Sequence, residues 1–201
     1  MSLTPGCPRC PTPVAQVGPE VSCPEHGVIS PVWRAEAASY DGFVDHLALA
    51  GTMPTLLPWP LGTEWNVGDF AVVPEVATLT AVRGPTDGGD VDLTLVVEQP
   101  GTGLGARVAG TSDPAEDLAY TPAHARVRIA GQAVSLWALD TGGTELDRTV
   151  LVGEHGGRWL WLILRPASAL LLMGREWHLR DVSALGMSLV ELPFGGPAGA
   201  W

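Results

Sequence analysis

The sequence predicts an α+β protein that is mainly antiparallel β: an N-terminal zinc ribbon, one helix, then a curved sheet of about six to eight strands. Two observations carry this prediction. Residues 7–26 hold two ligand pairs with the spacing of zinc knuckles, and a hydrophobic period of two dominates the chain from residue 77 onward. We expect two domains, a zinc ribbon over 1–34 and a helix plus antiparallel β domain over 35–201.

The ribbon rests on four residues. Cys7 and Cys10 form a C-x-x-C pair, and Cys23 and His26 form a C-x-x-H pair after twelve intervening residues. Each pair makes a tight turn that directs two ligands at one ion, and two such turns complete the tetrahedron of a structural Zn²⁺ site. Four ligands leave no open position for catalysis. A ribbon of about thirty residues cannot bury a core, so metal binding would supply its folding free energy.

The cysteines also bear on the compartment. All three lie within the first 23 residues, which is no disulfide framework, and the first residues lack the pattern of a secretory signal. We therefore expect a cytoplasmic protein. A redox pair of Cys7 and Cys10 alone remains as an alternative, but such pairs sit at a strand-to-helix turn of a βαβ unit, which this segment does not resemble.

A helix is expected within 34–51, before the sheet. Tyr40, Phe43, Val44 and Leu47 follow the i, i+3, i+4, i+7 stripe of an amphipathic helix, and Gly51 is a plausible C-cap. His46 lies beside this stripe. We expect it to be solvated or half-packed rather than a ligand.

The remaining elements are expected to be mostly strands. Prolines in 53–73 favour an extended edge segment, and Gly131-Gln132 favours a tight hairpin. Segments 84–90 and 111–118 are expected as surface loops, and a short helix near Asp181 should turn Leu185 and Leu189 inward. Strands are expected at 77–82, 91–97, 125–130, 133–139, 149–153, 158–164 and 168–173, the last two being apolar on both faces and therefore central or covered.

Charge and hydropathy limit the partners. The formal net charge is −11 and all eleven basic residues are arginine, so unspecific nucleic-acid binding is not expected, apart from a local contact through the ribbon near Arg9 and Arg34. The most apolar stretch, 159–174, is interrupted by Arg165-Pro166 and is shorter than the roughly 20 residues of a membrane span. We expect a protein partner and no membrane span.

Two features are candidates for binding a ligand or partner. The glycines of the segment 101–107 could cradle a phosphate with help from Arg107, although a plain loop after strand 91–97 explains them as well. Of eight tryptophans, Trp59 between prolines and Trp201 at the end of the sequence are the hardest to bury, which favours them as partner anchors. The candidates are therefore Trp59, Trp201, Gly101, Gly103, Gly105 and Arg107. No catalytic residues are predicted.

The motifs resemble a known family. In order, they are CPRC, CPEHG, LPWPLGTEW, LVVEQPGTGLGARVAG, RWLWLILRPASALLL and LPFG, and they cover almost the whole chain. This series resembles an uncharacterised actinobacterial family that contains a zinc ribbon. Members have carried the label phosphotransacetylase, which the sequence does not support because those enzymes alternate strands and helices. The body is also similar to the antiparallel half-barrels of bacterial lipoprotein carriers and anti-sigma-factor sensor domains, whose concave face holds acyl chains or partner peptides.

Three functions are compatible with these observations. The first is a non-enzymatic interaction or adaptor protein with a structural zinc ion. The alternative is a carrier or sensor that binds an apolar ligand on the concave face of the sheet. The third is an enzyme that acts on a phosphorylated small molecule through the segment 101–107. We expect the first, and not an enzyme.

Overall fold

The computed structural model describes residues 3–114, 122–141, 147–174, 177–199 and 201. Three strands of this part form a small sheet in the order β2 (Ala15–Val17), β3 (Glu20–Cys23) and β4 (Gly27–Ile29). Eleven form a large sheet, in the order β1 (Leu3–Gly6), β5 (Val32–Ala35), β7 (Asn66–Val73), β8 (Ala77–Thr86), β9 (Gly89–Glu98), β13 (Arg158–Arg165), β12 (Thr149–His155), β11 (Gln132–Leu139), β10 (Ala125–Ile129), β14 (Trp177–Asp181) and β6 (Leu56–Pro58).

This architecture confirms the predicted class, α+β and mainly antiparallel, but the large sheet has eleven strands in the described residues rather than six to eight. All strand pairs in the described part are antiparallel except β10 with β14. The described α-helices are α1 (Tyr40–Ala50) and the short α2 (Leu104–Ala109). Two 3₁₀ helices, η2 (Ala167–Gly174) and η3 (Gly186–Glu191), follow later in the chain. No helix in the described ranges has both the length and the apolar character needed to cross a bilayer.

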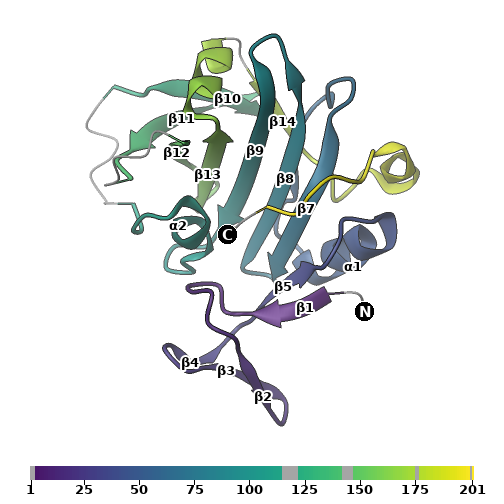
Figure 1. Ribbon diagram of the computed structural model, residues 1–201, viewed down its shortest axis with the longest axis vertical. Coiled ribbons are helices and arrows are strands. Elements are labelled where there is room, and N and C mark those ends of the chain that lie inside the picture. Colours follow the sequence, from purple (N-terminus) through teal and green to yellow (C-terminus); the bar gives the residue numbers. More distant parts are fainter. Residues whose placement is uncertain (1–2, 115–121, 142–146, 175–176, 200) are drawn as a thin grey trace.

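The small sheet projects from one end of the large one (Figure 1). The chain leaves the large sheet after β1 and returns to it in β5, and these two strands pair with each other while β5 pairs with β7. The expected boundary between residues 34 and 35 therefore falls inside β5. The segment with the four predicted ligands is thus held at both of its ends by strands of the large sheet.

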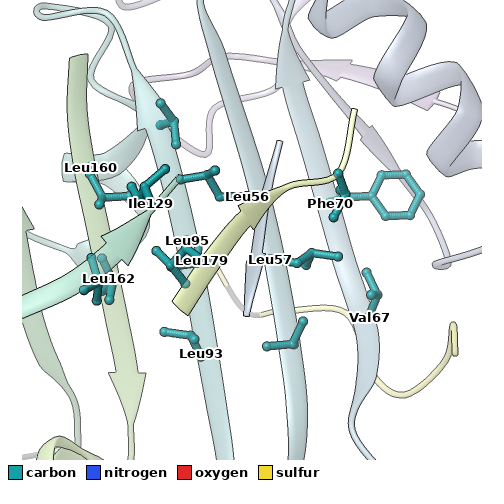
Figure 2. Close-up of a cluster of buried hydrophobic side chains, with 14 of the residues drawn as sticks. Leu56, Leu57, Val67, Phe70, Leu93, Leu95, Ile129, Leu160, Leu162 and Leu179 are labelled. Carbon is teal, nitrogen blue, oxygen red and sulfur yellow. The ribbon is translucent and has the colours of Figure 1, made fainter. Parts of the chain in front are cut away.

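The large sheet curls over one of its own faces, which we call the concave face. Its last strand, β6, crosses β8, and the hydroxyls of Thr78 and Thr80 donate hydrogen bonds of 2.6 Å to the carbonyls of Pro54 and Leu56. Apolar side chains fill the space between the crossing strands, as Figure 2 shows. The labelled residues of this core are Leu56, Leu57, Val67, Phe70, Leu93, Leu95, Ile129, Leu160, Leu162 and Leu179.

The opposite, convex face carries a second core. In β9, Val91, Leu93 and Leu95 face the concave core as the alternation predicts, and Val96 faces the convex one. Strand β13 is apolar on both faces and lies between β9 and β12, which confirms its predicted central position. Helix α2 covers part of the convex face: Leu104 and Ala109 pack there with Trp161, which is fully buried.

Helix α1 lies where it was predicted, but its buried face differs. Ser39 caps its first turn and Gly51 its last, whereas Tyr40 and Val44 are 40% and 42% exposed. The expectation for His46 was wrong, because its side chain is fully buried and stacks on Phe43. Its Nε2 lies 3.2 Å from the hydroxyl of Thr55, and burial lowers its pKa to about 3. A neutral imidazole is flat and largely apolar, so it takes the place of an aromatic core residue.

Two local predictions also need correction. The segment 168–173 is not a strand but part of η2, since a continuous apolar run does not distinguish strand from helix and Pro166 cannot donate to a sheet ladder. The last helix begins only at Gly186, because Asp181 ends β14 and accepts hydrogen bonds from the amides of Thr55 and Ser183.

Loop positions shift as well. Ala130 and Gly131 form the hairpin turn, with Ile129 paired to Gln132. Strands β8 and β9 extend into the expected loop 84–90, and their last pair is Thr86 with Gly89. The second half of the expected loop 111–118 lies outside the described residues.

Candidate metal centre and its surroundings

The four predicted ligands converge on one point. One donor atom from each of Cys7, Cys10, Cys23 and His26 lies within 4.8 Å of the other three. The Nδ1 atom of His26 is 3.6 Å from the sulfur of Cys7 and 3.5 Å from those of Cys10 and Cys23. The sulfurs of Cys10 and Cys23 are 3.5 Å apart. This Cys₃His cluster could hold a metal ion.

These distances fit the donor spacing of a tetrahedral zinc site. Zinc–sulfur bonds of about 2.3 Å and zinc–nitrogen bonds of about 2.0–2.1 Å place tetrahedral ligands about 3.5–3.8 Å apart. A disulfide does not fit, because its sulfurs would be about 2.0 Å apart and all three cysteines are free. The donor set, three soft thiols and one imidazole, is that of closed zinc sites.

Burial and hydrogen bonds both shift the pKa values of the Cys7 and Cys10 thiols. The three cysteines are at most 8% exposed, and the backbone N–H of Arg9 points at the sulfur of Cys7 over 3.4 Å. Burial raises the pKa of the Cys7 thiol. Burial also acts to raise the pKa of Cys10, but hydrogen bonds from Thr12 and the other two thiols outweigh it and lower that pKa to about 6. A lowered thiol pKa favours the thiolate that metals bind.

Two arginines fasten the cluster to the large sheet. Arg107, on α2, donates a hydrogen bond from Nη1 to the backbone carbonyl of Cys7. Arg9 lies between two ligands and donates to the carbonyls of Gly101 (2.8 Å) and Thr102 (3.3 Å). The glycine segment after β9 therefore acts as the body's contact with the first knuckle.

A cleft of about 320 Å³ lies beside this contact. The ribbon side contributes His26 and the hydrophobic pair Val28 and Ile29, and the body contributes Val73 and Val76. Val28 is 66% exposed, although it is apolar. His26 of the Cys₃His cluster and the valines Val73 and Val76 of the body thus face the same opening.

The amide groups of the glycine segment bind a carboxylate of the chain itself. Glu98, at the end of β9, accepts hydrogen bonds from the N–H groups of Leu104 (2.8 Å) and Gly105 (3.2 Å). The N–H groups that a phosphate at the start of α2 would use are therefore already occupied. Together with Arg107, these contacts give the predicted phosphate candidates Gly101, Gly103, Gly105 and Arg107 an internal role.

Trp201 also contacts its own chain. Its Nε1 donates to Asp69 over 2.9 Å, and its ring lies between the guanidinium groups of Arg34 (4.2 Å) and Arg107 (4.9 Å). Asp69, which is 2% exposed, forms a two-pronged ion pair with Arg34 (2.6 and 3.1 Å) and accepts from the N–H of Gly199. The tryptophan therefore closes the junction between ribbon, β7 and α2.

Trp59 is half-buried against the concave core. The guanidinium of Arg180 lies 5.0 Å from its ring centre, and its backbone N–H donates to the carbonyl of His178. Neither predicted tryptophan projects freely from the surface, whereas Val28 does. Sequence reasoning missed the cleft because its two walls are about fifty residues or more apart in the chain, and only the exposed valine of CPEHGVI hinted at it.

Fold and cluster together define a curled antiparallel sheet protein with a Cys₃His cluster that could hold a metal ion. The chain matches the model of a family of unknown function (DUF6758) over residues 1–200, and it belongs to that family. Comparison with curated proteins and with solved structures found no match.

Proposed function

We propose that this chain is a non-enzymatic adaptor whose Cys₃His cluster binds a structural zinc ion and shapes a docking cleft for a protein partner. The observation that carries the proposal is the attachment of the cluster: Arg107 and Arg9 fix its first knuckle to the body and leave an open apolar cleft beside it. A closed four-ligand site stabilises a fold rather than performing chemistry.

The partner that fits the cleft is a peptide segment with an apolar side chain. Val28, Ile29, Val73 and Val76 line the opening, and an exposed apolar residue in a recess is a usual anchor point for a partner. Arg9 also lines the cleft, but its guanidinium already donates to the two carbonyls of the body. The cleft therefore offers apolar contact, mainly from the exposed Val28, beside polar groups such as Ser30, Gln99 and Thr102.

The carrier alternative is less well supported. A ligand on the concave face needs free space there, but β6 and β14 cross that face and Leu57, Leu93 and Leu95 are at most 2% exposed. The phosphate enzyme is also less well supported, since Glu98 takes the amide groups that a phosphate would use.

Two valines of the ribbon provide a matched test. Val17 and Val28 are both 66% exposed, but only Val28 lines the cleft. Wild-type protein, Val28→Asp and Val17→Asp, each checked for zinc content, should be used as bait in extracts of the native cell. We expect a partner that wild type and Val17→Asp recover equally and that Val28→Asp loses. Equal recovery by all three baits, or no recovered partner, would contradict the docking cleft.

Point substitutions are preferable to truncation in this experiment. Removal of residues 1–34 would also delete β1 and most of β5, which belong to the large sheet. Loss of binding by such a truncation could reflect damage to the body. An aspartate at an exposed position changes the surface alone.

A further inference from the structure

A row of charged side chains crosses the convex face, far from the ribbon cleft. Arg165 of β13 lies opposite Asp92 of β9, and Asp92 lies opposite Arg83 of β8. Arg83 is engaged: its Nε is 3.4 Å from Asp92 and its Nη2 is 3.3 Å from Asp90. Arg83 is therefore the arginine of this row that is paired with carboxylates.

Arg165 is the unmatched member of this row. Within the described ranges, no residue forms a hydrogen bond or ion pair with its guanidinium, which is half-buried. Burial lowers the pKa of this guanidinium, and the nearby charge of Arg148 lowers it further, although Asp147 and Asp92 act in the opposite direction. A partly buried arginine outside an ion pair is costly, because water is partly removed and no carboxylate contacts it directly.

The row borders a pocket of about 170 Å³. Arg165 and Arg83 line it together with Thr94, whose hydroxyl has no hydrogen-bond partner among the described residues. The C-terminal segment 197–199 forms another wall. This segment can lie close to β7 because residue 68 is a glycine: a Cβ there would lie only 3.3 Å from the carbonyl oxygen of Pro197. The pocket thus combines two guanidinium groups, one hydroxyl and a wall of small residues.

We propose that this pocket binds a carboxylate group. Asp90 and Asp92 both pair with Arg83, so among the described residues Arg165 is the one guanidinium of the pocket outside an ion pair, and a single guanidinium matches a monoanion better than a dianion. The guanidinium fork of Arg165 can donate two parallel hydrogen bonds to the two oxygens of a carboxylate. Thr94 can donate a third. The carboxylate can belong to a small molecule or to an acidic side chain of a peptide.

This site is independent of the ribbon cleft. Arg165 and Thr94 lie on the convex face beyond the segment 197–199, and neither lines the cleft. Val28→Asp should therefore leave carboxylate binding unchanged. Failure of the docking cleft and failure of this pocket can be told apart.

Titration of the full-length protein, followed by amide NMR shifts, tests the proposal. Sodium acetate should be compared with sodium chloride and inorganic phosphate at equal ionic strength and pH 7. We expect saturable shifts of Thr94, Arg165 and Gly199 with acetate only. Arg165→Gln should weaken acetate binding about tenfold or more, as expected for loss of charge-assisted hydrogen bonds. The control Arg126→Gln, at an exposed arginine of β10, should bind like wild type.

A second ligand identifies the source of the carboxylate, and a second variant keeps the test valid if Arg165→Gln does not fold. A blocked glutamate, N-acetylglutamate amide, that binds more tightly than acetate would indicate a peptide ligand; equal or weaker binding would indicate a small molecule. Arg165→Lys keeps the charge but loses the fork, so it should bind acetate more weakly than wild type even if Arg165→Gln does not fold. Acetate shifts no larger than those of chloride, equal binding of phosphate, or full binding by Arg165→Lys would overturn the proposal.

Discussion

Arg107 donates a hydrogen bond from Nη1 to the backbone carbonyl of Cys7, the first ligand of the Cys₃His cluster. The two residues are a hundred positions apart in the sequence. The same guanidinium also lies against the ring of Trp201. One side chain on a six-residue helix therefore contacts both the Cys₃His segment and Trp201 near the convex face of the sheet.

Arg107→Gln should loosen the metal-binding module without unfolding the sheet. The variant loses a charge-assisted hydrogen bond and a stacking contact, together worth about 1–3 kcal/mol. Amide hydrogen exchange at residues 7–10 should become roughly tenfold faster or more, with little change in β8 and β9. Arg126→Gln is the matched control. Unchanged exchange at residues 7–10 would show that Arg107 does not hold the first knuckle.

Trp201→Ala should destabilise the fold rather than act on a partner. The substitution removes the hydrogen bond to Asp69 and the ring between Arg34 and Arg107, and a half-buried tryptophan should cost about 1–3 kcal/mol. Denaturant unfolding measures this loss. Trp201→Phe keeps a ring but not the N–H donor, so its cost should be intermediate. An unchanged free energy of unfolding in Trp201→Ala would contradict the junction described above.

Glu98 should make stability fall as the pH rises. Burial raises the pKa of its carboxyl to about 7 despite the hydrogen bonds from Gly105 and Leu104, against an ordinary value of 4.5. The folded chain therefore holds this proton more tightly than the unfolded chain. The resulting stability is complete below pH 4.5 and is lost as the pH rises through 7.

The test compares wild type with Glu98→Gln in urea between pH 5 and pH 8. The variant should gain stability relative to wild type over this interval, by on the order of 2–3 kcal/mol. His46 has the opposite effect, because its lowered pKa adds stability as the pH rises towards 6.5, but it is present in both proteins and cancels. The control Glu36→Gln, at an exposed position, should run parallel to wild type. If the stability of Glu98→Gln changed with pH in parallel with that of wild type, the raised pKa of Glu98 would be refuted.

Local patterns in the sequence were sufficient for part of this structure. The C-x-x-C and C-x-x-H spacing predicted the four donors that the fold brings together, because each pair is fixed by its own turn. The alternation in 91–97 predicted the faces of β9, because a strand with a core on one side repeats every two residues. Both inferences need only neighbours in the chain.

Other features depend on contacts between distant segments. His46 is buried because Phe43 and Thr55 enclose it, and nothing in the helical pattern distinguishes it from a surface histidine. Trp201 is held by Asp69, a residue 132 positions away. Its place at the end of the sequence suggested an exposed side chain and gave no sign of this contact. The glycines of 101–107 matched a phosphate loop, but the side chain of Glu98 already accepts hydrogen bonds from the N–H groups of Leu104 and Gly105.

The zinc content of the untagged protein tests the central claim most directly. Elemental analysis of purified wild type should give one zinc ion per chain, and Cys23→Ser, which removes one of the four donors, should lose most of it. Chelation of the wild-type protein should expose residues 7–30 to protease while the circular dichroism of the large sheet persists. Wild-type protein with far less than one zinc per chain, or Cys23→Ser with a full complement, would contradict the account.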